Sequence, residues 1–306
     1  MAGTVGYAHY AIRGLGGPLP TDLAVLETDD PPVRLAFANT SRQAVPRAQV
    51  LDPARDPTPD RPYEMSHPAF LLAWADGRRL LVDVGMEAEA ARSFGATLEL
   101  VGAAPAEALG SAAEQLPELA SGRLGVVFTH LHVDHVQGIG ALCALRGGAE
   151  IEVFQTPAQA ERRNYTTRPA ADQLAAAGCA RPVRLADAPL APLPGFPGVA
   201  VLWAAGHTPD SQVVLASVAR AGAAPRRIAF AGDVVNAVDG ARFDVPKPLL
   251  YRLLVTPEDD ARLGALRRFL GGLERDGFEL APAHDLLQLR ALGLDSAAPA
   301  AAGGRD

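Results

Sequence analysis

The chain has 306 residues and a formal net charge of −7, from 28 Lys and Arg residues against 35 Asp and Glu residues. This acidic balance gives no general electrostatic attraction for nucleic acid or an anionic membrane, so we expect neither as a partner. Hydrophobic residues make up 48% of the chain, and its Gly and Pro content stays below the roughly 25–30% typical of disorder. The composition therefore predicts a folded globular protein.

Neither a membrane span nor a disulfide framework is expected. No apolar run approaches the ~18 residues that cross a bilayer, and the N-terminus lacks the basic start and apolar stretch of a signal peptide. Only two cysteines occur, Cys143 and Cys179, and neither belongs to a CxxC pattern. We therefore interpret both as small buried apolar side chains in a reduced, cytoplasmic protein.

The first part of the chain gives weak signals. Residues 33–38 favour a strand, whereas residues 40–62 are rich in Pro, Arg and Asp and predict an extended arm or long loop. Such a loop is either a functional cover or a connector without a role. We interpret residues 1–65 as an N-terminal extension, 66–296 as the core of a single domain spanning 1–296, and 297–306 as a disordered tail.

Strands and helices alternate through the predicted core. An Asp76-Gly77 turn joins strands at 69–74 and 80–84 into a hairpin. Further strands are expected at 124–129, 151–154, 199–203, 212–217, 227–230 and 278–281. Helices are expected at 105–119, 136–145, 157–163, 170–177 and 257–273. This mixed order predicts an α/β domain.

The segment Thr129–His135, which reads THLHVDH, is the densest polar motif of the chain. Imidazole and carboxylate groups are the ligands of Zn²⁺ and related divalent ions. In an extended stretch His130 and His132 point the same way and can bind one ion. Asp134 and His135, at the start of the following helix, can face a second ion. The alternative is a polar loop with solvated histidines.

Three further ligand-type residues, His207, Asp233 and His284, each come directly after a predicted strand. A lone residue of this kind is most simply a polar loop residue. Loops after strands can gather at one rim of the sheets, however, and the five histidines and two aspartates then suffice for two ions sharing a bridging carboxylate. His9 and His67 have no such companions, so we interpret them as structural.

These motifs resemble the metallo-β-lactamase superfamily over roughly residues 69–285. They occur in the family's order: Leu81-Val82-Asp83-Val84-Gly85, Thr129–His135, Gly206-His207-Thr208-Pro209, Ala231-Gly232-Asp233 and Pro282-Ala283-His284. The resemblance implies an αβ/βα four-layer sandwich with two mixed β-sheets and metals at one edge. It assigns one ion to His130, His132 and His207, the other to Asp134, His135 and His284, and the bridge to Asp233.

The resemblance also implies a reaction. Two divalent ions about 3.5–4 Å apart, most simply Zn²⁺ with Fe or Mn as alternatives, can share a hydroxide that attacks the substrate. Asp134 is the candidate catalytic residue that moves a proton to the leaving group. Asp83 is expected to accept an imidazole N–H, although a carboxylate that caps a turn is an equal alternative. We expect a zinc-dependent hydrolase of the lactonase and phosphotriesterase-like branch, acting on a small-molecule lactone, carboxylic ester or organophosphate ester.

One position departs from the lactonase pattern. Lactonases of this superfamily usually carry a Tyr three residues after the bridging Asp, and here that position is Asn236. Tyr165 or Tyr251 could replace it, although a core or exposed Tyr explains each as well. We expect the substrate pocket to draw on Tyr165, Asn236, Phe243 and Tyr251.

Other functions stay open. An iron-dependent oxidoreductase of the persulfide dioxygenase kind uses the same motif with one iron. A nuclease-type phosphodiesterase predicts basic patches interleaved with aromatics, and the sequence contains only short Arg pairs. A binding module without catalysis is the least expected, because all seven ligands are present. A homodimer is a further open alternative.

Overall fold

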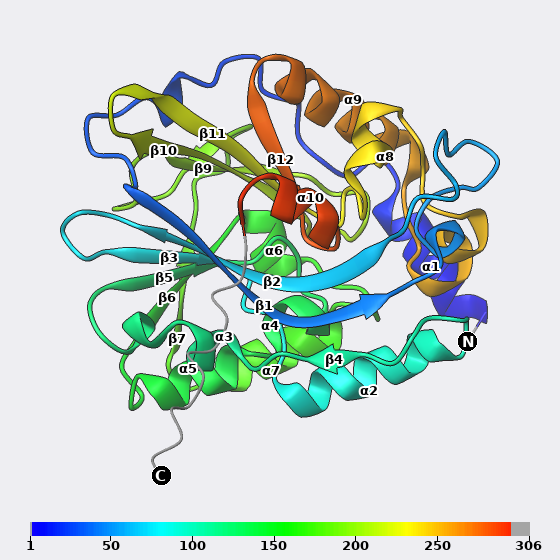
Figure 1. The fold of residues 1–306 in the computed structure, drawn as a ribbon, viewed down its shortest axis with the longest axis horizontal. Helices are drawn as coiled ribbons and strands as arrows, with labels where there is room; N and C mark the ends of the chain where they lie inside the picture. The colour runs from blue at the N-terminus through cyan, green and yellow to red at the C-terminus, as the bar shows by residue number, and fades with distance from the viewer. Residues whose placement is uncertain (1, 295–306) are drawn as a thin grey trace, which may run out of the picture.

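Residues 2–294, which the computed structural model describes, form a seven-stranded and a five-stranded sheet packed face to face, with helices on the outer faces (Figure 1). The predicted α/β sandwich of two mixed sheets is therefore confirmed. The predicted tail, 297–306, lies outside the described residues, and the single domain over 1–296 stays a prediction. No helix of the described residues is long and apolar enough to cross a membrane.

The seven-stranded sheet has the order β4-β1-β2-β3-β5-β6-β7. Its strands are β1 (Arg34–Ala44), β2 (Glu64–Ala73), β3 (Arg79–Val82), β4 (Glu107–Ala108), β5 (Leu124–Val127), β6 (Ile151–Gln155) and β7 (Ala180–Arg184). The five-stranded sheet has the order β12-β11-β10-β9-β8. Its strands are β8 (Ala191–Pro192), β9 (Val199–Trp203), β10 (Gln212–Arg220), β11 (Ala223–Gly232) and β12 (Phe278–Pro282).

The described residues also form ten helices, most of which lie on the outer faces of the sheets. They are α1 (Ala2–Ile12), α2 (Ala88–Glu99), α3 (Ala112–Gln115), α4 (Val133–Val136), α5 (Ile139–Leu145), α6 (Pro157–Glu161), α7 (Arg168–Ala176), α8 (Val238–Arg242), α9 (Asp260–Arg275) and α10 (Leu286–Ala291). Helix α10 packs into the core between the sheets instead. Short helical turns occur at η1 (Ala24–Leu26), η2 (Arg47–Gln49), η3 (Pro117–Ala120) and η4 (Tyr251–Val255). Figure 1 shows α8 and α9 on the five-stranded sheet, and α3, α5 and α7 on the other.

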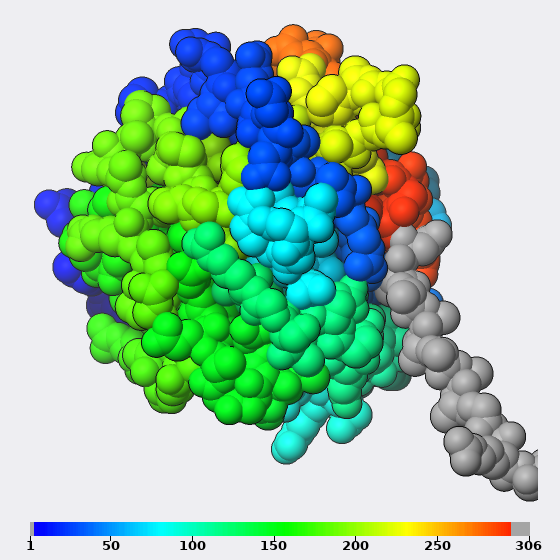
Figure 2. Space-filling view, turned by 90° about the vertical axis from the view of Figure 1, so that its left-hand side faces the viewer, coloured from blue at the N-terminus to red at the C-terminus, as the bar shows by residue number. Residues whose placement is uncertain are grey.

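Alternate residues of the central strands face two different cores, because side chains of a strand point to opposite faces in turn. Phe70 faces the space between the sheets, where its ring centroid lies 4.8 Å from that of Phe230. Leu71 and Leu81 face the outer helices instead. The tip of the β2–β3 hairpin packs against the segment before β1, where Trp74 Nε1 donates to Asp30 O at 3.2 Å (Figure 2).

The N-terminal half differs most from the sequence-based predictions. Helices α1 and α2 were not expected, and the helix predicted over 105–119 is replaced by β4, α3 and η3. Ser111 and Glu114 cap α3 reciprocally, and Pro117 follows it, so no long helix can run through this stretch. Strand β1 continues to Ala44 because its polar residues pair with β2 and β4, so the expected arm over 40–62 begins as a strand.

The two cysteines form a disulfide, which corrects the interpretation of both as unpaired small side chains. Cys143 lies in α5 and Cys179 lies just before β7, 36 residues further along the chain. The packing of α5 beside this edge of the sheet brings them together, which their spacing in the sequence does not indicate. The disulfide ties the outer helical layer to the edge of the seven-stranded sheet.

We expect this disulfide to stabilise the fold. Closing a loop of this length removes conformational entropy from the unfolded chain worth roughly 3–4 kcal/mol. Reduction should therefore lower the free energy of unfolding of the wild type in denaturant titrations. The double variant Cys143→Ser, Cys179→Ser should be insensitive to the reductant. Two reactive thiols in denatured, non-reduced protein would contradict the pairing.

The loop after β1 is anchored by a buried ion-pair cluster. Arg47 Nε donates to Asp56 Oδ2 at 2.6 Å, and its Nη2 donates to Asp239 Oδ2 at 2.8 Å. All three side chains are buried. Burial alone would raise the pKa of Asp56, but the hydrogen bond from Arg47 holds that pKa below its ordinary value. Arg47 therefore fastens both ends of this segment, residues 47 and 56, to Asp239 of α8.

Replacing Arg47 should destabilise the protein strongly at neutral pH. Arg47→Ala leaves two carboxylates buried without their partner, which costs about 3–5 kcal/mol. Because the pKa of Asp56 is lowered in the folded state, this contribution is present above the ordinary carboxyl pKa of 3.8 and is lost as the pH falls through the lower folded value. Denaturant titrations at pH 7 and pH 3 should show a smaller gap between the variant and wild type at pH 3.

Arg34→Ala is the matched control, since Arg34 pairs with Glu118 at 2.8 Å on the surface. It should change the free energy of unfolding by less than ~1 kcal/mol. Equal effects of the two substitutions at pH 7 would contradict an anchoring role for Arg47.

Candidate metal centre

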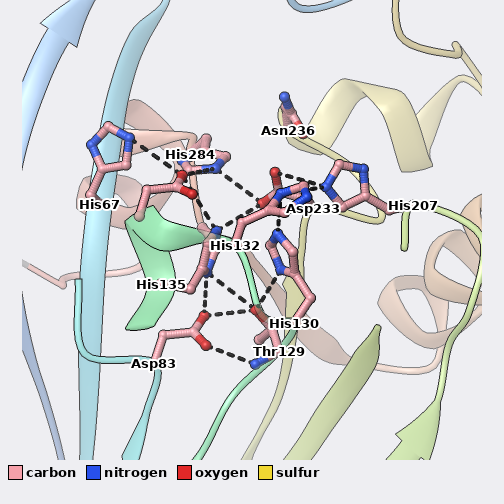
Figure 3. A network of polar contacts seen from close by, with 12 residues as sticks. His67, Asp83, Thr129, His130, His132, His135, His207, Asp233, Asn236 and His284 are labelled. Carbon is pink, nitrogen blue, oxygen red and sulfur yellow. Dashed lines mark hydrogen bonds and ion pairs between the residues drawn. The ribbon is translucent and has the colours of Figure 1, made fainter. Parts of the chain in front are cut away.

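The structure brings all seven predicted ligands together at one edge of the sandwich (Figure 3). They lie in the loops and helix that follow strands from both sheets: His130 and His132 after β5, Asp134 and His135 in α4, His207 after β9, Asp233 after β11 and His284 after β12. Parallel strands end at the same edge of their sheet, so residues far apart in the sequence meet there.

One group of ligand atoms consists of three imidazoles and one carboxylate. His130 Nε2 lies 3.0 Å from His132 Nδ1, which lies 3.3 Å from His207 Nε2. Asp233 Oδ2 lies 3.5 Å from His207 Nε2. These four atoms all fall within 4.8 Å of one another, a spacing at which they could hold one metal ion.

A second group lies on the other side of Asp233. His284 Nε2 is 3.0 Å and His135 Nε2 is 3.4 Å from Asp233 Oδ1. Asp134 Oδ2 lies 3.4 Å from His284 Nε2 and 3.6 Å from His135 Nε2. The two oxygens of Asp233 thus face two different sets of donors, which is the arrangement a bridging carboxylate requires.

Buried carboxylates orient two of the imidazoles from behind. Glu258 Oε1 accepts a hydrogen bond from His207 Nδ1 at 2.6 Å, and Asp83 Oδ2 accepts one from His135 Nδ1 at 2.8 Å. A proton held on Nδ1 leaves the lone pair of Nε2 facing the centre. Asp83 Oδ1 also accepts from the Thr129 backbone N–H at 2.7 Å, so both of its carboxylate oxygens are held in place.

The other rings are held by neutral groups. His284 Nδ1 donates to Ser66 O at 2.7 Å. His132 is reversed, because its Nε2 lies 2.8 Å from Thr166 Oγ1 and its Nδ1 faces the centre. Each ring is therefore fixed with one nitrogen turned inward.

Lys247 is a buried contributor that sequence reasoning missed. Its ammonium donates to Glu258 Oε1 and to Asp233 O, both at 2.7 Å. Burial would raise the pKa of Glu258, but Lys247 and the hydrogen bond from His207 hold that pKa below its ordinary value. A signal was available, since Lys247 is the chain's only lysine.

Burial and mutual repulsion keep some of these imidazoles neutral. Burial, together with the neighbouring rings, lowers the pKa of His130 well below its ordinary value and that of His132 to about 3. Burial alone would raise the pKa of Asp233, but His284, His130 and His135 hold it well below its ordinary value. Burial alone would lower the pKa of His135 and His284 as well, but neighbouring carboxylates raise the first well above and the second above its ordinary value. Metal binding at these two rings would therefore release protons.

The donor set fits a divalent cation. Within residues 2–294, the buried atoms His135 Nε2 and Asp233 Oδ1 have no hydrogen-bond partner, and such unpaired buried groups are costly. Five imidazoles and two carboxylates are the ligands that Zn²⁺ and related transition metals take. A cation between them would satisfy the atoms that the protein leaves unpaired.

The four predicted pocket residues are less closely grouped. Asn236 is buried at the margin of the centre (Figure 3), and its backbone O accepts from Tyr63 Oη at 2.9 Å. Tyr251 lies beside the centre, with its ring centroid 5.3 Å from Lys247 Nζ. Phe243 is exposed after α8. Tyr165 directly precedes Thr166, whose Oγ1 lies 2.8 Å from His132 Nε2.

Glu258→Gln should weaken metal binding. Loss of the carboxylate behind His207 removes the fixed ring orientation, and such changes typically cost 10–100-fold in metal affinity. Competition with a chelator for Zn²⁺ measures this. Glu279→Gln is the control: it alters a carboxylate of β12 that pairs with Arg226 of β11, and it should leave the affinity for Zn²⁺ unchanged. Equal affinities for the two variants would contradict the orienting role.

Comparisons with known proteins agree with this geometry. The sequence model of the metallo-beta-lactamase superfamily matches residues 63–288. A search of curated proteins found no significant match.

Among solved structures, the chain is similar to an N-acyl homoserine lactone hydrolase with its product bound at the catalytic metal centre. The TM-score is 0.56 at 16% identity, covering 85% of this chain and 96% of that one. A dizinc quorum-quenching lactonase, AidC, gives 0.50 at 14% identity, covering 83% and 90%. A probable metal-dependent hydrolase from Staphylococcus aureus gives 0.53 at 11% identity, covering 84% and 91%.

At these identities the structural similarities establish the fold alone, whereas the sequence match extends over most of the chain. The chain belongs to the metallo-beta-lactamase superfamily.

Proposed function

We propose that this chain is a dinuclear metal-dependent hydrolase that cleaves a lactone, a carboxylic ester or an organophosphate ester. The observation that carries the proposal is the placement of Asp233, whose Oδ2 faces His207 while its Oδ1 faces His284 and His135. Two structurally similar proteins support it, since one is named as a lactone hydrolase with a catalytic metal centre and the other as a dizinc lactonase.

The seven side chains would hold two ions. His130, His132 and His207 would hold the first, Asp134, His135 and His284 the second, and Asp233 would contact both. When bound, such ions lower the pKa of a water molecule to about 7 and polarise a carbonyl or phosphoryl oxygen. The nitrogen-rich donor set favours Zn²⁺, with Fe or Mn as alternatives.

Asp134 is our candidate for proton transfer. Its Oδ2 faces the imidazoles of His284 and His135, which leaves Oδ1 as the oxygen that can take a proton and pass it to the leaving oxygen. The nearby imidazoles hold the pKa of Asp134 below its ordinary value although burial alone would raise it. The carboxylate therefore starts the reaction ionised and able to accept a proton.

The surroundings of Lys247 favour a substrate with an apolar group. The segment that follows it exposes five large apolar side chains: Leu249, Leu250, Leu253, Leu254 and Val255. Helix α1 lies against this segment, with His9 Nε2 3.0 Å from Leu253 O (Figure 1). An exposed apolar run beside a candidate active site suits an acyl or aryl substituent of a small molecule.

Location and assembly remain predictions. A cytoplasmic location was inferred from unpaired cysteines, and the Cys143–Cys179 disulfide removes that reason because disulfides are rare in reducing compartments. A homodimer stays an open alternative.

The proposal is tested with purified chain loaded with Zn²⁺, Mn²⁺ or Fe²⁺. We expect hydrolysis of at least one class among N-acyl lactones, aryl esters and phosphotriesters. Asp233→Ala should lower that activity at least about 100-fold, because it removes one carboxylate oxygen from each of the two groups of ligand atoms. Asp276→Ala, at an exposed position, is the control that should retain full activity.

Three results would reject the proposed hydrolase. They are inactivity on all three classes with two ions bound, sulfur-dependent oxygen uptake by an iron-loaded protein, and cleavage of RNA or DNA without action on small esters.

A further inference from the structure

An eighth side chain reaches the centre from β2. His67 is buried, and its Nε2 lies 3.7 Å from Asp134 Oδ2. Its ring centroid is 5.0 Å from that of His284, and Figure 3 shows the His67 ring beside His284 at the edge of the group. The expectation that His67 has no ligand-type residues around it is therefore wrong.

The packing around His67 fixes its ring. Nδ1 lies 2.7 Å from Ser41 Oγ, and the ring of Phe94 makes an edge contact with centroids 5.1 Å apart. The backbone N–H donates to Asn39 Oδ1, and the backbone O accepts from Thr40 Oγ1. These contacts leave Nε2 directed at the centre.

Nε2 itself is unsatisfied, because it is buried and has no hydrogen-bond partner in the described part of the chain. A buried polar atom without a partner costs free energy, so a structure that fixes one in place usually supplies a ligand. The 3.7 Å separation from Asp134 is too long for a hydrogen bond.

The same separation suits two ligands of one ion. Donors that each lie about 2.0–2.2 Å from an ion can be no more than about 4.4 Å apart. His67 Nε2 and His284 Nε2 lie 3.7 and 3.4 Å from Asp134 Oδ2. Both distances lie below that limit, and His67, Asp134 and His284 form a third group of residues that could hold a metal.

We propose that His67 is an additional ligand of the ion held by Asp134 and His284. This inference rests on the proposed dinuclear site. It gives that ion one more protein donor than the resemblance to the superfamily implies. That ion should therefore be retained more firmly than it would be without the His67 donor.

Histidine NMR counts the ligands directly. The chain has seven histidines, so untagged protein labelled with ¹⁵N-histidine gives seven imidazoles to follow during titration of the metal-free protein with Zn²⁺ alone. We expect six rings to acquire metal-bound nitrogen shifts and His9, which contacts Leu253, to stay unchanged. His67→Gln identifies the sixth signal, and His9→Gln identifies the silent one.

The outcomes separate this inference from the proposed function. Five shifted rings with two ions bound would overturn the role of His67 and leave the dinuclear hydrolase standing. Fewer than five would contradict the dinuclear site itself. The wild-type count decides the question even if His67→Gln does not fold.

Affinity gives an independent measure. In chelator competition with Zn²⁺, His67→Gln should weaken one of the two binding steps by at least about 10-fold, since even residues that only orient the ligands cost 10–100-fold when they are lost. The other step should match the wild type. His9→Gln should leave both steps unchanged, and two unchanged steps in His67→Gln would overturn the proposal.

Discussion

The geometry of this edge of the sandwich is governed by one constraint: imidazole nitrogens and carboxylate oxygens are buried close together around a common centre. Nitrogens of His130, His132 and His207 approach one another to 3.0–3.3 Å. Burial lowers the pKa of these rings, so their inward lone pairs stay unprotonated and repel one another. Such an arrangement is stable when a cation accepts the lone pairs, which couples metal binding to the stability of the fold. Asp233 belongs to both groups of ligand atoms, and each group combines residues that follow strands of both sheets.

The scaffold serves this requirement from both halves. Asp83 follows β3 of one sheet and orients His135, while Glu258 precedes α9 on the other side and orients His207. Lys247 balances the charge of Glu258 and also donates to the backbone O of Asp233, so the position of Asp233 depends on a buried ion pair. Asp83 takes a left-handed backbone conformation, with φ of +57°, which a non-glycine residue keeps only when its surroundings hold it there.

Local signals predicted an α/β domain and the meeting of the seven residues at one rim, whereas the resemblance to the superfamily supplied the two-sheet sandwich. Thr129–His135 is dense in ligands, and His207, Asp233 and His284 each follow a strand. His67 escaped notice because it stands alone in an apolar strand and reaches the centre only through the pairing of β2 within the sheet. The disulfide was missed for the same reason, since only tertiary packing joins α5 to the start of β7. Lys247 could have been noticed from the sequence, because it is the single lysine in a chain whose other basic residues are Arg or His. Glu258, its partner, would then have been sought nearby.

Crystallographic anomalous scattering from protein soaked with Zn²⁺ or Mn²⁺ tests the central claim most directly. Two peaks about 3.5–4 Å apart on either side of the Asp233 carboxylate, with imidazole nitrogens as ligands on both, are the predicted result. A single peak, or seven side chains that stay apart from any bound ion, would contradict the dinuclear centre.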